Sequence, residues 1–124
     1  MQTEKVANHI INWLTDYCKN AKMEGFVVGV SGGIDSATTS TLCAMTGLKT
    51  HVLEMPIHQA KSQVTRAQEH IEQLKERFPN VSSDVVDLTP VFEQFKKQVP
   101  DAQDNTLLDL SLANTRARLR MTTL

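Results

Sequence analysis

The chain has 124 residues, of which 40% are hydrophobic and 22% charged, and these values are typical of one globular domain. Thirteen Lys and Arg against 14 Asp and Glu give a formal net charge of −1, which argues against a large basic surface for nucleic acid. The longest apolar run, residues 26–30, is far shorter than the roughly 20 residues of a membrane span. No signal-peptide core follows Met1, so we expect a cytoplasmic protein without membrane or nucleic-acid partners.

The first half of the sequence alternates helical and strand patterns. A helix is predicted over residues 3–23, a buried strand over 26–30, a helix over 37–45 and a second strand over 51–55. The apolar face predicted for the first helix consists of Val6, Ile10, Trp13, Leu14 and Tyr17.

The second half continues the alternation. A strongly amphipathic helix is predicted over residues 60–78, a strand over 81–88, a short helix over 91–98, a polar loop over 101–105 and a last helix from about 107. The apolar stripe of the long helix comprises Val64, Ala67, Ile71, Leu74 and Phe78. The stripe of the last helix comprises Leu110, Ala113, Ala117, Met121 and Leu124.

This order of elements predicts an α/β fold. Strands joined through helices make right-handed crossovers, so we expect a parallel sheet with helices on both faces, a three-layer α/β/α arrangement. The helical pattern runs to Leu124 without a cap, Gly or Pro. We therefore expect residues 1–124 to be the N-terminal portion of a single longer domain; a frayed natural C-terminus is the alternative.

The most informative segment runs from Gly29 to Ala37, between the first strand and the next helix. Adjacent glycines let backbone N–H groups turn toward an anion, and Ser31 and Ser36 add hydroxyl donors. The start of the following helix adds a positive dipole end, so the segment predicts a phosphate or pyrophosphate cradle. Asp35 would repel phosphate unless it binds Mg²⁺, which would bridge the two.

Three other interpretations of this loop are less favourable. The glycines alone would suit a plain strand-to-helix turn. Residues 29–33 also fit the G-x-S-x-G nucleophile elbow, whose fold requires an acid and then a histidine after the serine. The last histidine is His70, and the only acids between it and Ser31 are Asp35, Glu54 and Glu69. A Walker loop is excluded because the segment contains no lysine.

The hexapeptide Ser31-Gly32-Gly33-Ile34-Asp35-Ser36 resembles the S-G-G-x-D-S pyrophosphate loop of the N-type ATP pyrophosphatases. That resemblance implies an adenine nucleotide alpha hydrolase-like fold, with ATP and Mg²⁺ as cofactors and an adenylated substrate. It implies Asp35 as the metal ligand. The implied ATP-binding residues are Gly29, Val30, Ser31, Gly32, Gly33, Ile34, Asp35, Ser36, Met55 and Pro56.

The segment from Asn114 to Met121 resembles the N-x-x-A-R-x-R-M segment of the ammonia-dependent NAD synthetase family. The resemblance implies a carbon–nitrogen ligase that amidates deamido-NAD to NAD with ATP and ammonia, releasing AMP and pyrophosphate. It also implies a homodimer, and contacts from Arg118 or Arg120 to the substrate. Arginines that extend along the helix border toward solvent are the alternative for both.

The resemblance covers only the N-terminal half of such a synthetase domain, so we expect little or no activity from residues 1–124 alone. Two further interpretations stay open at this point. One is another N-type ATP pyrophosphatase, such as a GMP synthetase or a tRNA-modifying enzyme. The other is a non-catalytic module that binds adenine nucleotides.

Overall fold

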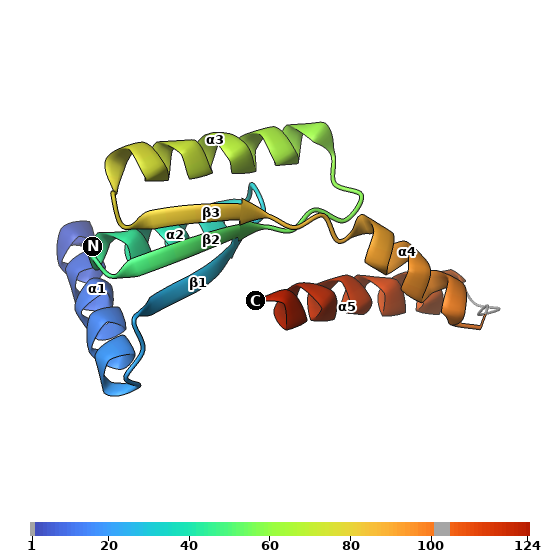
Figure 1. Ribbon diagram of the computed structural model, residues 1–124, viewed down its shortest axis with the longest axis horizontal. Coiled ribbons are helices and arrows are strands. Elements are labelled where there is room, and N and C mark those ends of the chain that lie inside the picture. Colours follow the sequence, from blue (N-terminus) through green and yellow to red (C-terminus); the bar gives the residue numbers. More distant parts are fainter. Residues whose placement is uncertain (1, 101–104) are drawn as a thin grey trace.

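The computed structural model describes residues 2–100 and 105–124, and Figure 1 shows their arrangement. Residues 101–104 of the predicted polar loop lie outside these ranges. The strands are β1 (Gly25–Val30), β2 (Lys49–Glu54) and β3 (Val81–Val85). The helices are α1 (Thr3–Asn20), α2 (Ile34–Met45), α3 (Lys61–Arg77), α4 (Thr89–Gln98) and α5 (Asn105–Thr123). No helix in the described ranges is long and apolar enough to cross a membrane.

The three strands form a parallel sheet in the order β1-β2-β3, which confirms the predicted α/β fold. In the register, Val30 on β1 lies opposite Glu54 on β2, and Glu54 lies opposite Val85 on β3. Because neighbouring strands are joined through α2 and α3, all three strands end at the same edge of the sheet. The loops that follow β1 and β2 are therefore brought together there.

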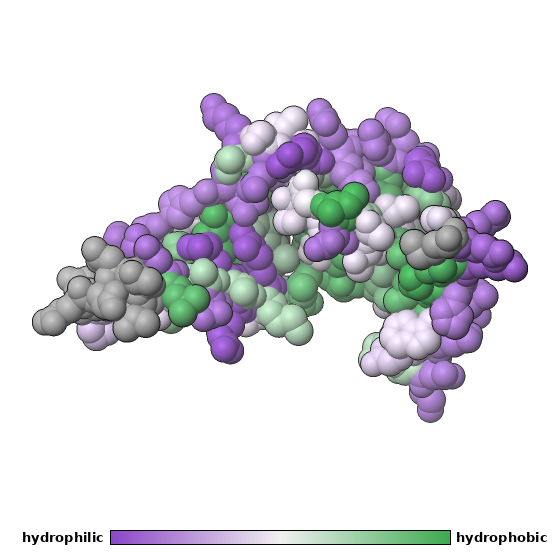
Figure 2. Space-filling model, turned by 180° about the vertical axis from the view of Figure 1, so that it is seen from behind, coloured by the Kyte–Doolittle hydropathy of each residue, from purple (hydrophilic) through white to green (hydrophobic). Residues whose placement is uncertain are grey.

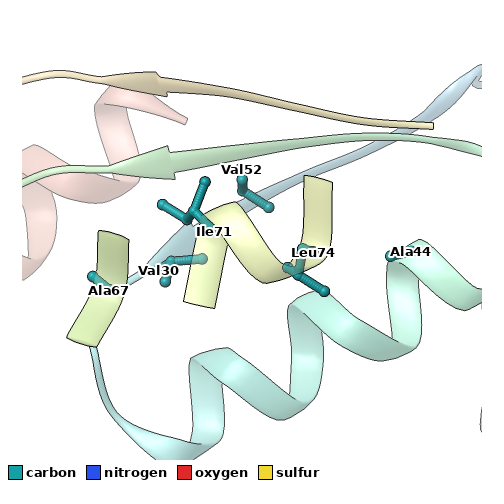
Figure 3. Packing of buried hydrophobic residues seen from close by; sticks show 6 residues of the cluster. All are labelled: Val30, Ala44, Val52, Ala67, Ile71 and Leu74. Carbon is teal, nitrogen blue, oxygen red and sulfur yellow. The ribbon is translucent and has the colours of Figure 1, made fainter. Parts of the chain in front are cut away.

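The main hydrophobic core lies between one face of the sheet and helices α2 and α3. Figure 3 shows its side chains, which come from β1, α2, β2 and α3: Val30, Ala44, Val52, Ala67, Ile71 and Leu74. The last three belong to the stripe predicted for the long helix, and Phe78 packs against the same cluster. The predicted face of α3 is thus confirmed.

A second cluster covers the opposite face at the carboxyl ends of the strands. Consecutive side chains of a strand point to opposite faces of the sheet, so Leu53 points away from the main core that contains Val52. Leu53 packs with Met55 and with Phe92 of α4, and Leu112 and Leu119 of α5 join them. Helices α4 and α5 therefore form an arm beyond the strand ends, and the reverse view shows apolar residues where this arm meets the body (Figure 2).

Two predicted boundaries are wrong in ways that matter for the loop and the arm. Helix α2 begins at Ile34 rather than at residue 37, so Asp35 lies in its first turn. Strand β3 ends at Val85 instead of continuing to residue 88, and α4 begins at Thr89, so that Pro90 lies in its first turn and not ahead of the helix. The fixed φ of proline suits the first turn of a helix, where its missing N–H costs nothing.

The predicted face of α1 is wrong in part. Trp13 and Tyr17 are 56% and 62% exposed, and their rings stack on each other with centroids 5.1 Å apart. Cys18 is instead the buried residue of this helix. Helix α1 packs mainly on α2, so only a narrow side of it is covered. A wide apolar stripe therefore leaves its bulkiest members in solvent.

The predicted stripe of α5 is also wrong as a packing face. Met121 is 74% exposed, and Leu110 and Leu124 are exposed as well. The side that packs on the second cluster carries Leu112 and Leu119. Helix α5 has apolar residues on more than one side, so its periodicity alone does not select the buried side.

Candidate nucleotide-binding site

The glycine loop after β1 is shaped by close contact with α3. Gly32 has φ +86°, a backbone conformation that favours glycine. A Cβ atom at this position would lie 2.5 Å from the carbonyl oxygen of Gln63, in the first turn of α3. The loop thus rests directly on the backbone of α3, and a side chain at Gly32 would push the two apart.

The hydroxyl of Ser36 closes the loop from inside. Its Oγ accepts a hydrogen bond from the backbone N–H of Ser31 at 3.1 Å, and the Ser31 Oγ lies 3.3 Å away. Ser36 Oγ also donates to the carbonyl oxygen of Gly33 at 3.3 Å. Both hydroxyls are predicted from the sequence to bind a phosphate. In this geometry Ser36 organises the loop, while Ser31 is exposed.

The N-terminal end of α2 is open. Gly33 is its N-cap residue, with extended backbone angles, and no side chain caps the helix start. The first N–H groups of a helix have no partner within the helix, and together with the dipole they attract an anion. Ile34 and Asp35 are exposed beside them. The predicted phosphate cradle thus has backbone donors that are not already used by a capping side chain.

A cavity of about 320 Å³ lies between the carboxyl ends of β1 and β2, α3 and the C-terminal part of α5. Six predicted site residues line it, from three separate segments of the chain: Gly29, Val30, Ser31, Met55, Pro56 and Arg120. A Cβ on Gly29 would lie 3.0 Å from the Met55 Cε atom. This glycine therefore leaves room for the buried Met55 side chain in the cavity wall.

Arg120 connects α5 to the end of β2. Its Nε–H donates to the Met55 carbonyl oxygen at 3.0 Å, and its side chain lines the cavity. Burial and the nearby Arg116 guanidinium lower the pKa of Arg120, so a bound anion would offset an unfavourable environment for this cation. Arg118 is exposed and does not line the cavity. The structure thus brings only one of the two predicted arginines to the site.

A second cavity, of about 280 Å³, lies on the other side of the loop. Gly32, Gly33 and Ile34 line it, together with Arg66 and His70 of α3. The Nε2 atom of His70 lies 2.9 Å from the Ser40 Oγ, and burial lowers the pKa of this imidazole.

Arg66 and His70 are site residues that no local sequence pattern indicates. Their four-residue spacing places them on one side of α3, but only the tertiary contact brings that side to the loop.

The loop could hold a divalent cation only together with a bound phosphate, because it offers a single carboxylate. Asp35 offers hard carboxylate oxygens at the helix start, a donor type that Mg²⁺ prefers. No group of three or more His, Cys, Asp or Glu side chains in the described part of the chain could hold a metal ion. Because Mg²⁺ in nucleotide sites typically takes one or two carboxylates plus phosphate oxygens, one aspartate beside a phosphate cradle is compatible with it.

Comparison with known proteins identifies the family. Residues 6–124 match the family model described as NAD synthase. The chain is 31% identical over 125 residues to the NH(3)-dependent NAD(+) synthetase of Mesoplasma florum, and 34% identical over 126 residues to that of Methanosarcina mazei. Both alignments cover 100% of this chain, but 49% and 47% of the relatives. The chain thus spans about half the length of the curated relatives it matches.

Solved structures agree. An NMN synthetase from Francisella tularensis superposes with a TM-score of 0.86 at 33% identity, over 100% of this chain and 49% of that one. The NH3-dependent NAD synthetase from Campylobacter jejuni gives 0.84 at 29% identity, over 100% and 51%. Together with the family match, these similarities favour NAD synthase over the other ATP pyrophosphatases that the loop alone left open. The chain belongs to the NAD synthase family.

Proposed function

We propose that this chain supplies the ATP-binding part of a synthetase that amidates deamido-NAD to NAD with ammonia. In that reaction the nicotinate carboxylate attacks the α-phosphorus of ATP and pyrophosphate leaves; ammonia then displaces AMP from the adenylated carboxylate. The observation that carries the proposal is the closed Ser31–Ser36 loop at the uncapped start of α2, next to a cavity that also receives Arg120. Membership of the NAD synthase family supports the choice of reaction.

The loop residues would position the pyrophosphate that leaves. Backbone N–H groups at Gly32, Gly33 and the start of α2 donate to phosphate oxygens, and the Ser31 hydroxyl adds a donor. Asp35 would hold Mg²⁺, which when bound neutralises charge that develops on the phosphates. No nucleophile from the protein is needed, because this chemistry relies on positioning and electrostatic stabilisation.

Arg120 is the better candidate for an anionic part of a substrate. Its guanidinium is held by the Met55 carbonyl on one side and lines the cavity on the other. A partly buried, oriented guanidinium suits a phosphate or carboxylate, because its N–H groups form a planar fork. Arg118 points to solvent in the described structure, so its contribution would need a further segment or a second chain. The homodimer and the cytoplasmic location remain predictions.

A second acceptor has specific support. The Francisella tularensis structure with a TM-score of 0.86 is an NMN synthetase. By the same amidation chemistry, NMN would form from nicotinate mononucleotide, which lacks the second nucleotide of deamido-NAD. The ATP-binding part would serve either acceptor, and an assay with each of them distinguishes the two reactions.

Pyrophosphate release tests both acceptors. The assay contains ATP, Mg²⁺, ammonium and either deamido-NAD or nicotinate mononucleotide. We expect the 124-residue chain alone to show little turnover. A chimera in which it replaces the matched half of the Methanosarcina mazei enzyme should release pyrophosphate only when an acceptor is present. Full turnover by the chain alone would contradict the first expectation, and acceptor-independent release by the chimera would contradict the second.

Asp35 is tested separately by ATP binding to the chain. Asp35→Asn should weaken ATP binding when Mg²⁺ is present and leave it almost unchanged when EDTA removes the ion. Calorimetric titration measures both. Asp109→Asn, an exposed aspartate on α5 away from the loop, serves as the charge-matched control. Equal Mg²⁺ dependence in the Asp35 variant and the unchanged chain would exclude this residue as the ligand.

A further inference from the structure

Ser40 of α2 carries a buried hydroxyl that contacts three polar atoms at once. Its residue is 0% exposed, and its Oγ lies 2.7 Å from the Ser36 carbonyl oxygen and 3.1 Å from that of Ala37. The third atom is the Nε2 of His70, at 2.9 Å, which belongs to the neighbouring helix α3. A side chain of α3 is therefore hydrogen-bonded to α2 one turn after the glycine loop.

The direction of this bond follows from the number of protons available. The Ser40 hydroxyl has one proton, and two oxygens lie 2.7 Å apart only with a proton between them, so the hydroxyl donates to the Ser36 carbonyl. His70 must then donate to the Ser40 Oγ, which makes its imidazole an Nε2–H tautomer with a bare Nδ1. Burial lowers the pKa of this imidazole, so the ring remains neutral at physiological pH.

These hydrogen bonds lead from α3 into the phosphate loop. His70 donates to Ser40, and Ser40 donates to the main chain of Ser36. The side chain of the same Ser36 closes the loop, because its Oγ accepts from the Ser31 N–H and donates to the Gly33 carbonyl oxygen. Ser36 thus receives the link from α3 on its main chain and holds the loop with its side chain.

The apolar contacts between α2 and α3 have no direction of their own. Ala44 and Leu74 belong to the same core cluster, but burial of apolar surface alone does not fix how one helix is shifted along another. The contact of Gly32 with the Gln63 backbone limits only how closely the loop approaches α3. A hydrogen bond has a preferred distance and angle, so the bond from His70 sets where the first turns of α2 lie relative to α3.

We propose that His70 is a positioning residue for phosphate binding, which acts through Ser40 to hold the N-terminal turn of α2 and the loop in place. The backbone N–H groups of that turn stabilise a phosphate best when they already point to its oxygens, because donors that must reorganise contribute less. His70 therefore needs no contact with the nucleotide. This inference rests on the proposed function, in which the loop binds the pyrophosphate part of ATP.

The test compares ATP with AMP, which lacks the pyrophosphate part assigned to the loop. Calorimetric titration of the 124-residue chain with each nucleotide, in Mg²⁺, gives the ratio of the two affinities. His70→Leu removes the donor and should lower this ratio roughly two- to tenfold, as expected for one hydrogen bond. Weaker binding of ATP alone should account for the change. A side chain that only stabilised the fold would lower both affinities by the same factor and leave the ratio unchanged.

Further variants isolate the bond between the two helices. His70→Gln places an amide N–H close to the position of Nε2 and should restore the ratio. Ser40→Ala should lower the ratio as His70→Leu does, and the double variant should lose no more than either single one, because both changes break the same link. His51→Leu is the matched control, since it removes a histidine that is hydrogen-bonded to Ser82 and Asp84 on the sheet, and it should leave the ratio unchanged.

¹⁵N NMR tests the tautomer independently of ligand binding. The protonated and the bare nitrogens of a neutral imidazole resonate far apart, and comparison with the spectrum of His70→Gln identifies the signals of His70. We expect the proton on Nε2 and none on Nδ1. A proton on Nδ1 would mean that His70 accepts from Ser40 instead, which would break the link to Ser36 and overturn the proposal.

The outcomes separate this inference from the proposed function. An unchanged ATP-to-AMP ratio in His70→Leu, or an equal fall in His51→Leu, would overturn the role of His70 and leave phosphate binding by the loop intact. Equal affinity for ATP and AMP in the unchanged chain, or no binding of either, would overturn both. Circular dichroism checks that each variant is folded, and if His70→Leu does not fold, the ratio in Ser40→Ala and the tautomer of His70 decide.

Discussion

Helices α3 and α5 line opposite sides of the same cavity, yet they are held in different ways. Helix α3 packs into the main core with Ala67, Ile71 and Leu74, the stripe that its sequence predicts. The predicted stripe of α5 is not packed in a core: Leu110 is exposed, and Ala117 and Met121 line the open cavity. Leu112 and Leu119 pack on the smaller cluster instead.

The difference lies in how each sequence distributes its apolar residues. In α3 they occupy one side and charges the other, so the period of the helix identifies the buried face. In α5 they occur around the helix, and contacts made by other segments decide its orientation. These contacts include the Arg120 bond to Met55 and the Arg116 guanidinium over the Phe92 ring at 5.6 Å. Periodicity thus predicts a packed face only where a single face is apolar.

Truncating one leucine in each helix sharpens this comparison most. Leu74 of α3 is 1% exposed, whereas Leu110 in the predicted stripe of α5 is 61% exposed. Leu74→Ala should lower the free energy of unfolding by about 2–5 kcal/mol, because it leaves a cavity in the core. Leu110→Ala should stay within about 0.5 kcal/mol. Urea unfolding followed by circular dichroism measures both. A loss of unfolding free energy at Leu110 as large as at Leu74 would show that the predicted stripe of α5 is a packing face.

A glycine pair tests how firmly the loop rests on α3. Gly32 and Gly47 both have positive φ, but a Cβ at Gly47 would meet nothing within 4 Å. Gly47→Ala should cost about 1–2 kcal/mol for the left-handed backbone. Gly32→Ala should cost a further 1–3 kcal/mol or so, because its Cβ overlaps the Gln63 carbonyl. Unfolding curves for the two variants give the difference directly, and indistinguishable midpoints would argue against the loop contact.

Two arginines of α5 test whether the hydrogen bond from Arg120 anchors this helix to the sheet. Arg120→Ala removes the hydrogen bond to Met55 and should lower the free energy of unfolding by about 1–2 kcal/mol. Arg118→Ala alters an exposed side chain and should change it by less than about 0.5 kcal/mol. The same urea experiment applies. If the two variants lose equal stability, the bond from Arg120 does not anchor the helix.

The smallest effect is expected for Glu54, on the strand between the two helices. Its folded-state pKa is raised by burial above the unfolded value of about 4.3, so stability present below that pH is lost as pH rises through the folded pKa. Glu54→Gln stays neutral, so its stability relative to the unchanged chain should increase with pH over this window. Thermal unfolding from pH 4 to 8 measures the trend, and a constant difference between the two proteins would count against a buried acid that titrates.

Much of the fold could be predicted, because the strand after Gly25 is a short apolar run, the next strand is bounded by Gly47 and Pro56, and α3 has one clear face. The glycine loop was also identifiable, since its residues are contiguous. What could not be predicted depends on contacts between distant segments. Glu54 gives no local sign that its carboxyl is unpartnered, and Arg66 reaches the loop only through the packing of α3.

Arg120 has a consequence for energetics beyond its own contacts, because the residue that joins α5 to β2 also lines the cavity. Ligand binding and docking of α5 are therefore thermodynamically linked. The observed association constant equals the intrinsic one multiplied by the fraction of molecules in which α5 is docked. In return, a ligand at 100 times its Kd would stabilise the docked arrangement by about 2.7 kcal/mol. Occupancy of the cavity and order in the C-terminal helix should thus rise and fall together.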